Sequence, residues 1–412
     1  MGTARASVGG VLVHGSGPAL WRVAGGQILA SYDFTGQSLG ALTLPGALQF
    51  ARTGAALVAD HSAGIVSSSA VSANNARSGK SATGRTGMRF EEPKTNAYGY
   101  ANTPSLASST AGSSGSTFTT GRTGPDGGTT ATRIQQNSGT FSRYQGITTA
   151  GALTTYCLSA WVKAGLGSGV YLICAPYAGT LGAAVTGTAG ASWARATGFY
   201  AYPSTSASNL VGADGRANAP TGASAGARDF DVAFIQFEIG QPSDPILTSG
   251  GSTATRNGER LYLADCAGLV LGGRLALEIV LEMPSSISGP TVASQSLFYF
   301  DANNRAEIAT GTGVVTVTIN GSTFTSSSND TWTSGQLHKV WIECGGNGLQ
   351  TVVKSQNDGG ATRTIGTSSS PQAALPTSGA LDLLCAGATN QLAGLVQSIT
   401  FHAPGGRPAW VA

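Results

Sequence analysis

Charged residues are scarce in this sequence, because Lys, Arg, Asp and Glu together make up only 10% of its 412 residues. The formal net charge is only +3, and the sequence contains no run of five like charges. A protein that binds nucleic acid needs a concentrated basic surface to neutralise the phosphates. The composition therefore argues against nucleic acid as a partner.

Long apolar runs are also missing from this chain. No stretch approaches the run of about 18 apolar residues from which a membrane-spanning helix is predicted. Residues 1–14 contain no continuous apolar run of the length that a secretion signal requires. We therefore expect no membrane insertion, and a protein that is made and kept in the cytoplasm.

Residues that form disulfides or bind metals are few and scattered. The four histidines have no companion at metal-ligand spacing. The sequence contains five cysteines, an odd number, and each lies within or beside an apolar segment. We predict that all five are small buried thiols: Cys157, Cys174, Cys266, Cys344 and Cys385.

The sequence is instead rich in glycine, with 60 residues, and in serine and threonine. These are weak helix formers, whereas the interspersed Thr, Val, Tyr, Phe and Ile favour strands joined by turns. We therefore predict an all-β protein. Its length predicts more than one domain.

Two regions show the alternation of strands that bury one face. In residues 155–165 the same face would carry Tyr156, Leu158, Ala160 and Val162, and partner strands are indicated at 169–174, 193–202 and 231–240. In the second region the expected core face is Leu275, Leu277, Ile279, Leu281 and Met283, with the opposite face open to water. Asn320-Gly321 marks a two-residue hairpin turn there. We predict two tandem antiparallel β-sandwiches.

Residues 86–97 combine an apolar pair, two adjacent carboxylates, a proline and a Thr-Asn step. This stretch resembles the "Gly-Leu-x-Ile-Glu-x-x-x-Thr-Asn" signature that opens a jelly-roll module in phage tail-fibre and other virion surface proteins. Residues 50–60 resemble the "Phe-x-Arg-x-Ser/Thr-x-Ala" segment that precedes it there. In the resembling proteins, the signature joins an attachment region to carbohydrate-binding domains.

This resemblance implies a domain order for the chain. Residues 1–92 would be an attachment and lead-in region, and residues 93–240 a jelly roll similar to carbohydrate-binding modules. A linker at 241–258, rich in Pro, Ser and Gly, would precede a second domain at 259–412. That second domain resembles concanavalin-like, laminin-G-like lectin sandwiches, which phage fibres also carry.

Sugar binding requires an apolar ring face for the pyranose, and amides or acids for its hydroxyls. Aromatic residues beside turn residues are candidates, although a single aromatic in a sandwich more often belongs to the core. Asp301 and Asn304, with Asn303 and Arg305, form a polar cluster that could contact hydroxyls or could be a simple turn. The aromatic candidates are Tyr177, Trp193, Tyr200, Tyr202 and Trp332.

Catalytic and cofactor signals are weak. The close carboxylate pairs are neighbours in sequence only, and solvated charges explain most of them. Asp229 and Asp231 could hold a structural calcium ion at a strand end, as in related jelly rolls. We predict no catalytic residues and no other cofactor.

The resemblance implies a phage virion surface protein, a fibre or fibre-like decoration, that binds host or environmental glycans non-covalently. It would contact other virion proteins through its N-terminal region and assemble as a homotrimer or another homo-oligomer. One alternative is a structural head or tail decoration protein that binds no sugar. A further alternative, which ranks last, is a depolymerising tailspike, because such a protein should carry a long parallel β-helix and the sequence shows no such repeat.

Overall fold

The computed structural model describes residues 2–3, 6–8, 11–13, 28–35, 39–44, 48–99, 115–147, 154–163, 170–176, 183–186, 190–201, 209–214, 226–248, 252–283, 294–309, 312–326, 333, 335–346, 348–368, 372–387 and 389–411. Nearly all of their regular structure is β-strand, and the only other regular element among these residues is the 3₁₀ turn η2 (Ala409–Val411). The predicted all-β fold class is therefore confirmed. Within the same residues, no helix has the length and apolar character needed to cross a membrane.

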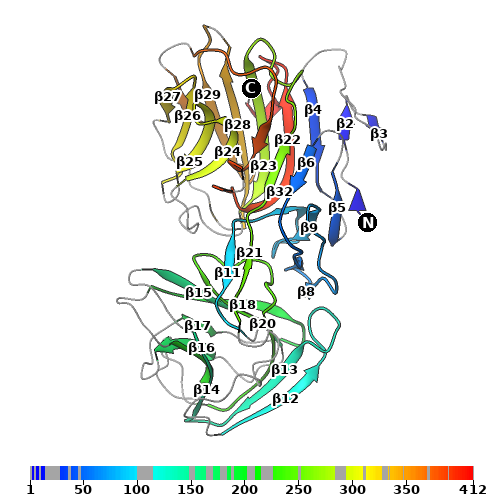
Figure 1. The fold of residues 1–412 in the computed structure, drawn as a ribbon, viewed down its shortest axis with the longest axis vertical. Coiled ribbons are helices and arrows are strands. Elements are labelled where there is room, and N and C mark those ends of the chain that lie inside the picture. Colours follow the sequence, from blue (N-terminus) through cyan, green and yellow to red (C-terminus); the bar gives the residue numbers. More distant parts are fainter. Residues whose placement is uncertain are drawn as a thin grey trace. The chain divides into compact units, whose positions relative to one another are not determined.

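The chain folds into two compact units, each assembled from separate stretches of sequence (Figure 1). Unit 1 consists of residues 1–55, 71–93 and 257–412, and unit 2 consists of residues 56–70 and 94–256. The chain thus changes units close to the predicted start of the first sandwich and the predicted end of the linker. It differs from the prediction in residues 1–92, most of which belong to unit 1.

Unit 1 is a sandwich of two sheets. Its larger sheet has the strand order β1-β5-β9-β10-β32-β23-β28-β29-β30, with β4 also paired to β32, and its second sheet has the order β27-β26-β25-β24-β31-β22-β6. The strands of unit 1 are β1 (Gly2–Thr3), β2 (Ala6–Val8), β3 (Val11–Val13), β4 (Ile28–Asp33), β5 (Gly40–Thr43), β6 (Leu48–Ala51), β9 (Ala76–Lys80), β10 (Thr86–Phe90), β22 (Arg260–Leu263), β23 (Arg274–Glu282), β24 (Ser294–Asp301), β25 (Asn304–Ala309), β26 (Val315–Ile319), β27 (Ser322–Thr325), β28 (Leu337–Gly345), β29 (Val352–Asn357), β30 (Arg363–Thr367), β31 (Leu381–Leu383) and β32 (Gly394–His402).

Strands from the predicted attachment region complete both sheets of unit 1. Met88 of β10 pairs with Val396 of β32, and β4 pairs with the following part of β32. In the second sheet, Phe50 of β6 pairs with Leu261 of β22. In Figure 1 the blue β4 and β6 accordingly lie beside the red β32 and the green β22. These strands satisfy backbone groups that would otherwise form open sheet edges, so this segment is part of the sandwich.

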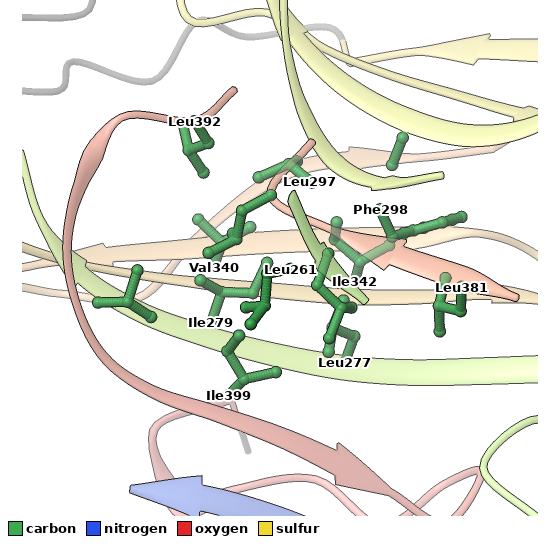
Figure 2. Close-up of a cluster of buried hydrophobic side chains, with 14 of the residues drawn as sticks. Leu261, Leu277, Ile279, Leu297, Phe298, Val340, Ile342, Leu381, Leu392 and Ile399 are labelled. Carbon is green, nitrogen blue, oxygen red and sulfur yellow. The ribbon is translucent and has the colours of Figure 1, made fainter. Parts of the chain in front are cut away.

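The core of unit 1 lies between the two sheets, and Figure 2 shows side chains from both layers pointing toward one another. The predicted face of β23 is confirmed, because Leu275, Leu277, Ile279, Leu281 and Met283 all belong to this core. The opposite face of β23 is less open to water than predicted. Ala276 packs with Trp341 and Val411, and Glu282 is buried. The side chains labelled in Figure 2 are Leu261, Leu277, Ile279, Leu297, Phe298, Val340, Ile342, Leu381, Leu392 and Ile399.

A buried polar cluster joins the early strands of unit 1 to its C-terminal part. The Glu259 carboxylate accepts hydrogen bonds from Arg52 Nη1 (3.1 Å) and Arg77 Nη2 (2.6 Å), and the side chains of all three residues are fully buried. Arg77 Nη2 also donates to Glu91 (2.7 Å), whose backbone N–H donates to Glu259 (2.8 Å). Glu91, one of the two adjacent carboxylates in residues 86–97, is therefore a structural residue.

Unit 2 contains a five-stranded sheet with the order β12-β13-β20-β15-β18 and a four-stranded sheet with the order β14-β19-β16-β17. The predicted face of β15 is confirmed, since Tyr156, Leu158, Ala160 and Val162 lie in the core. The strands of unit 2 are β7 (Ala59–Asp60), β8 (Ile65–Val66), β11 (Lys94–Asn96), β12 (Ser116–Arg122), β13 (Ala131–Gln136), β14 (Phe141–Ile147), β15 (Thr155–Lys163), β16 (Val170–Pro176), β17 (Ala183–Thr186), β18 (Ala194–Ala201), β19 (Asn209–Asp214), β20 (Arg228–Ile239) and β21 (Ala254–Arg256).

The Thr-Asn step of residues 86–97 anchors the entry of the chain into unit 2. Asn96 is fully buried, and its side-chain amide donates to the backbone carbonyls of Ile235 (3.1 Å) and Ile246 (3.2 Å). Its side-chain oxygen accepts from the backbone N–H groups of Tyr98 and Phe237, each at 3.0 Å. This one side chain thus satisfies four backbone groups, which explains the need for asparagine at this position.

Two further predictions concern the hairpin turn and the thiols. Asn320 (φ 47°) and Gly321 (φ 78°) both have positive φ between β26 and β27, as the predicted two-residue turn requires. Four cysteines are free and buried, and the side chain of Cys174 lies outside what the structure describes. Burial raises the pKa of Cys385 to about 12 and that of Cys266 to about 11, so these thiols are unreactive at neutral pH.

Candidate functional site

The outer face of the second sheet of unit 1 carries a continuous row of polar and aromatic side chains. Leu261 and Leu263 of β22, and Leu381 and Leu383 of β31, point into the core. Because side chains alternate along a strand, the residues between them lie on the outer face. Cross-strand pairing then aligns one residue from each of the seven strands, which we call the tyrosine row: Gln49, Tyr262, Asp382, Tyr299, Arg305, Thr318 and Thr323.

Arg260 contacts both Tyr262 and Asp382 near the middle of the tyrosine row. The guanidinium of Arg260 lies over the ring of Tyr262, 4.4 Å from its centroid. It also bonds to Asp382 Oδ1 through Nε (2.8 Å) and Nη2 (2.7 Å). The hydrogen bond to Asp382 is the main cause of the raised pKa of Arg260.

The buried carboxylate of Asp382 holds the more exposed guanidinium of Arg260 in position. Its side chain is only 5% exposed, whereas that of Arg260 is 36% exposed. Asp382 Oδ2 accepts a second hydrogen bond from the backbone N–H of Gly387 (2.6 Å). Asp382 therefore positions the guanidinium, and Arg260 presents it to solvent.

Tyr299 lies on the other side of Asp382, where its cross-strand neighbours are Asp382 and Arg305. Tyr262 and Tyr299 are both half-buried. One strand separates them, so the strand spacing places their backbones about 10 Å apart. Arg305 is ion-paired with Glu307 through Nε (3.0 Å). The row thus combines two accessible aromatic side chains with planar hydrogen-bonding groups.

The predicted polar cluster forms the tip of the hairpin between β24 and β25, next to the tyrosine row. Asn304 Nδ2 lies 3.1 Å from both carboxylate oxygens of Asp301, and Asn304 Oδ1 accepts from the backbone N–H of Asn320 (3.0 Å). Asp301 also accepts from the backbone N–H of Asn303 (2.7 Å). The structure therefore brings Asp301 and Asn304 together, and their bonds join two hairpin tips.

The described aromatic candidates lie in unit 2. Trp193 is half-buried and packs against a small apolar cluster that includes Trp161 and Phe234. Tyr200 pairs with Tyr156 across the strands and packs against the core. The exposed aromatic of β18 is instead its neighbour Phe199, which is 46% exposed. Three further candidates lie outside the residues that the structure describes: Tyr177, Tyr202 and Trp332.

The two carboxylates considered for calcium face arginines on neighbouring strands. Asp229 makes a two-point contact with Arg133, with Nε to Oδ1 and Nη2 to Oδ2 both at 2.6 Å, and this contact lowers the pKa of Asp229. Asp231 lies 3.6 Å from Arg122. Across the described ranges, no group of three or more His, Cys, Asp or Glu is arranged to hold a metal ion.

The residues at the centre of the tyrosine row were not predicted from the sequence as site residues. Tyr262, Tyr299 and Asp382 lie far apart along the chain, and only the strand pairing brings them together. A local signal was nevertheless present. Arg-Leu-Tyr-Leu at 260–263 and Leu-Asp-Leu at 381–383 both place a polar or aromatic residue opposite core leucines.

Comparisons with known proteins add little to this description. No protein-family model matches the sequence, and no curated protein matches it. Among solved structures, the chain is similar to domains LG4-5 of the mouse laminin alpha1 chain. That match has 12% sequence identity and a TM-score of 0.20, and covers 62% of this chain and 86% of the laminin chain. At that score the likeness carries no argument, so the β-sandwich assignment rests on the sheet pairing described above.

Proposed function

We propose that this protein binds glycans without modifying them, and that the tyrosine row is its binding face. The observation that carries the proposal is the placement of Tyr262 and Tyr299 on either side of Asp382, whose carboxylate holds the Arg260 guanidinium over the Tyr262 ring. Aromatic rings offer apolar surface to the C–H face of a sugar, and planar donors suit its hydroxyls. The hairpin tip with Asp301 and Asn304 supplies further polar groups beside the row.

We propose a virion surface as the setting, on the basis of the resemblance of residues 86–97 to phage fibre proteins. The protein would be made in the cytoplasm of the host and would attach the particle to host or environmental glycans. A homotrimer or another symmetric assembly would multiply weak sites into useful avidity. Because β4, β6, β9 and β10 are strands of unit 1, contacts with other virion proteins would use a surface of that sandwich.

Affinity electrophoresis of the full chain tests this proposal, with soluble dextran, mannan, xylan, hyaluronan or alginate cast in the gel and polymer size followed in parallel. We expect at least one polymer to retard the protein and to keep its length. Tyr299→Ala should weaken that binding about tenfold, which corresponds to about 1.4 kcal/mol of lost ring contact. Near-ultraviolet circular dichroism would check that the variant is folded.

Phe199→Ala is the matched control, because Phe199 is an exposed aromatic on an outer strand of unit 2. It should bind like the unaltered chain. Loss of binding in Phe199→Ala, with normal binding in Tyr299→Ala, would move the site to unit 2. No retardation by any polymer would favour a structural decoration protein, and shortening of a polymer would reveal a catalytic site.

A further inference from the structure

We infer that the ligand of the tyrosine row is an uncharged oligosaccharide longer than one sugar ring, lying across the strands. This inference rests on the proposed function and concerns the chemical class of the glycan. Two features of the row carry it. One is the pairing of its charged groups, and the other is the spacing of its aromatic groups.

The charged groups at the row are already neutralised by one another. Arg260 is paired with Asp382 at 2.7 Å, and Arg305 is paired with Glu307 at 3.0 Å. Asp301 adds a further exposed carboxylate at the adjacent hairpin tip. A sugar that carries a carboxylate or sulfate would meet arginines whose positive charges are already balanced by Asp382 and Glu307. It would also be repelled by Asp301, so the row disfavours acidic glycans.

The groups that remain available suit hydroxyls. Arg260 uses Nε and Nη2 for Asp382, which leaves Nη1 without a bonding partner among the described residues. Gln49, at one end of the row, exposes an uncharged amide. Thr323, at the other end, is exposed, and its hydroxyl oxygen lies 3.4 Å from that of the buried Thr318. Hydroxyl and amide groups both donate and accept hydrogen bonds, as a neutral sugar requires.

The spacing of the row favours a ligand of several rings. The backbones of Tyr262 and Tyr299 are about 10 Å apart, because two strand spacings of about 4.8 Å separate them. Side chains that rise from backbones this far apart suit a ligand longer than a single pyranose. The row crosses all seven strands, so a chain of linked sugars can meet both tyrosines and the exposed Thr323 beyond them.

Competition measurements with the full chain test this inference. A neutral polymer that retards the protein would be competed with its monosaccharide and with its oligosaccharides of increasing length. Hyaluronan and alginate would be tried directly at low and high salt. We expect the longer oligosaccharides to compete at least tenfold better than the monosaccharide. We also expect no retardation by the acidic polymers, and neutral binding that changes less than twofold with salt.

Asp382→Asn sharpens the test, because an asparagine keeps an oxygen for Arg260 but removes the neutralising charge. This variant should gain salt-sensitive binding to hyaluronan or alginate, and Asp358→Asn, at an exposed ion pair outside the row, should not. Equal competition by the monosaccharide, or acidic binding by the unaltered chain that Tyr299→Ala abolishes, would overturn the inference and leave the proposed function intact. Failure of every polymer to bind would overturn both.

Discussion

Replacing Glu259 by glutamine removes the carboxylate at the centre of the buried polar cluster of unit 1. Glu259 accepts from Arg52, from Arg77 and from the backbone N–H of Glu91, and its side chain is fully buried. A glutamine has nearly the same shape, but it carries no charge and replaces one acceptor oxygen with an amide donor. The substitution therefore leaves two buried guanidinium groups short of a partner.

The expected loss of stability depends on the hydrogen bonds that Arg52 and Arg77 keep in the variant. Breaking a buried ion pair by removing one partner costs about 3–5 kcal/mol. Arg77 keeps its bond to Glu91, and Arg52 keeps the carbonyls of Val71 and Ser72. We therefore expect Glu259→Gln to lower the free energy of unfolding of unit 1 by about 3 kcal/mol, the lower end of this range. With a urea dependence of about 2–3 kcal/mol/M, the unfolding midpoint of unit 1 should fall by about 1 M.

Urea unfolding followed by pulsed hydrogen exchange and mass spectrometry would report each unit separately. Peptides from β23 would report unit 1, and peptides from β15 would report unit 2. Asp358→Asn is the control, because Asp358 is 44% exposed and its ion pair with Arg85 should contribute less than about 1 kcal/mol. The reasoning is refuted if Glu259→Gln shifts unit 1 no more than this control, or shifts unit 2 equally.

Two further predictions concern unit 2. Burial raises the pKa of Glu238 in the folded protein. The contribution of Glu238 to stability is therefore fully present below its pKa in the unfolded chain, about 4.3, and is lost as the pH rises through its pKa in the folded protein. Glu238→Gln should abolish that decline, which urea midpoints between pH 4 and 8 would reveal. Asn96→Asp should lower the free energy of unfolding by about 2–5 kcal/mol, because a carboxylate cannot donate to the carbonyls of Ile235 and Ile246. Thr95→Val, at the exposed neighbour, should cost below about 1 kcal/mol in the same assay, and a similar loss in both variants would contradict the role of Asn96.

Local sequence was sufficient for the fold class and for the most regular strands. Alternation assigned the core faces of β15 and β23 correctly because each strand has its own apolar face. The turn at Asn320-Gly321 was predictable because positive φ at two adjacent positions favours those two residue types. Asp301 and Asn304 could be expected to lie together because they are three residues apart across a turn.

Local sequence was not sufficient to decide which aromatics are accessible. Tyr200 and Phe199 are neighbours in one strand, so one must face the core and the other must not. Composition favours neither arrangement. The pairing of Tyr200 with Tyr156 across the strands decides that Tyr200 packs against the core and Phe199 faces outward.

The all-β class, the turn at Asn320-Gly321 and the core faces of β15 and β23 follow from local sequence, because they depend on the conformational preferences of neighbouring residues. The tertiary structure was needed to show that residues 1–92 contribute strands to the C-terminal sandwich, and that Tyr262, Asp382 and Tyr299 form one row. Each of these pairings joins segments that are far apart in the sequence. They depend on how the whole chain folds, so no local stretch of sequence contains them.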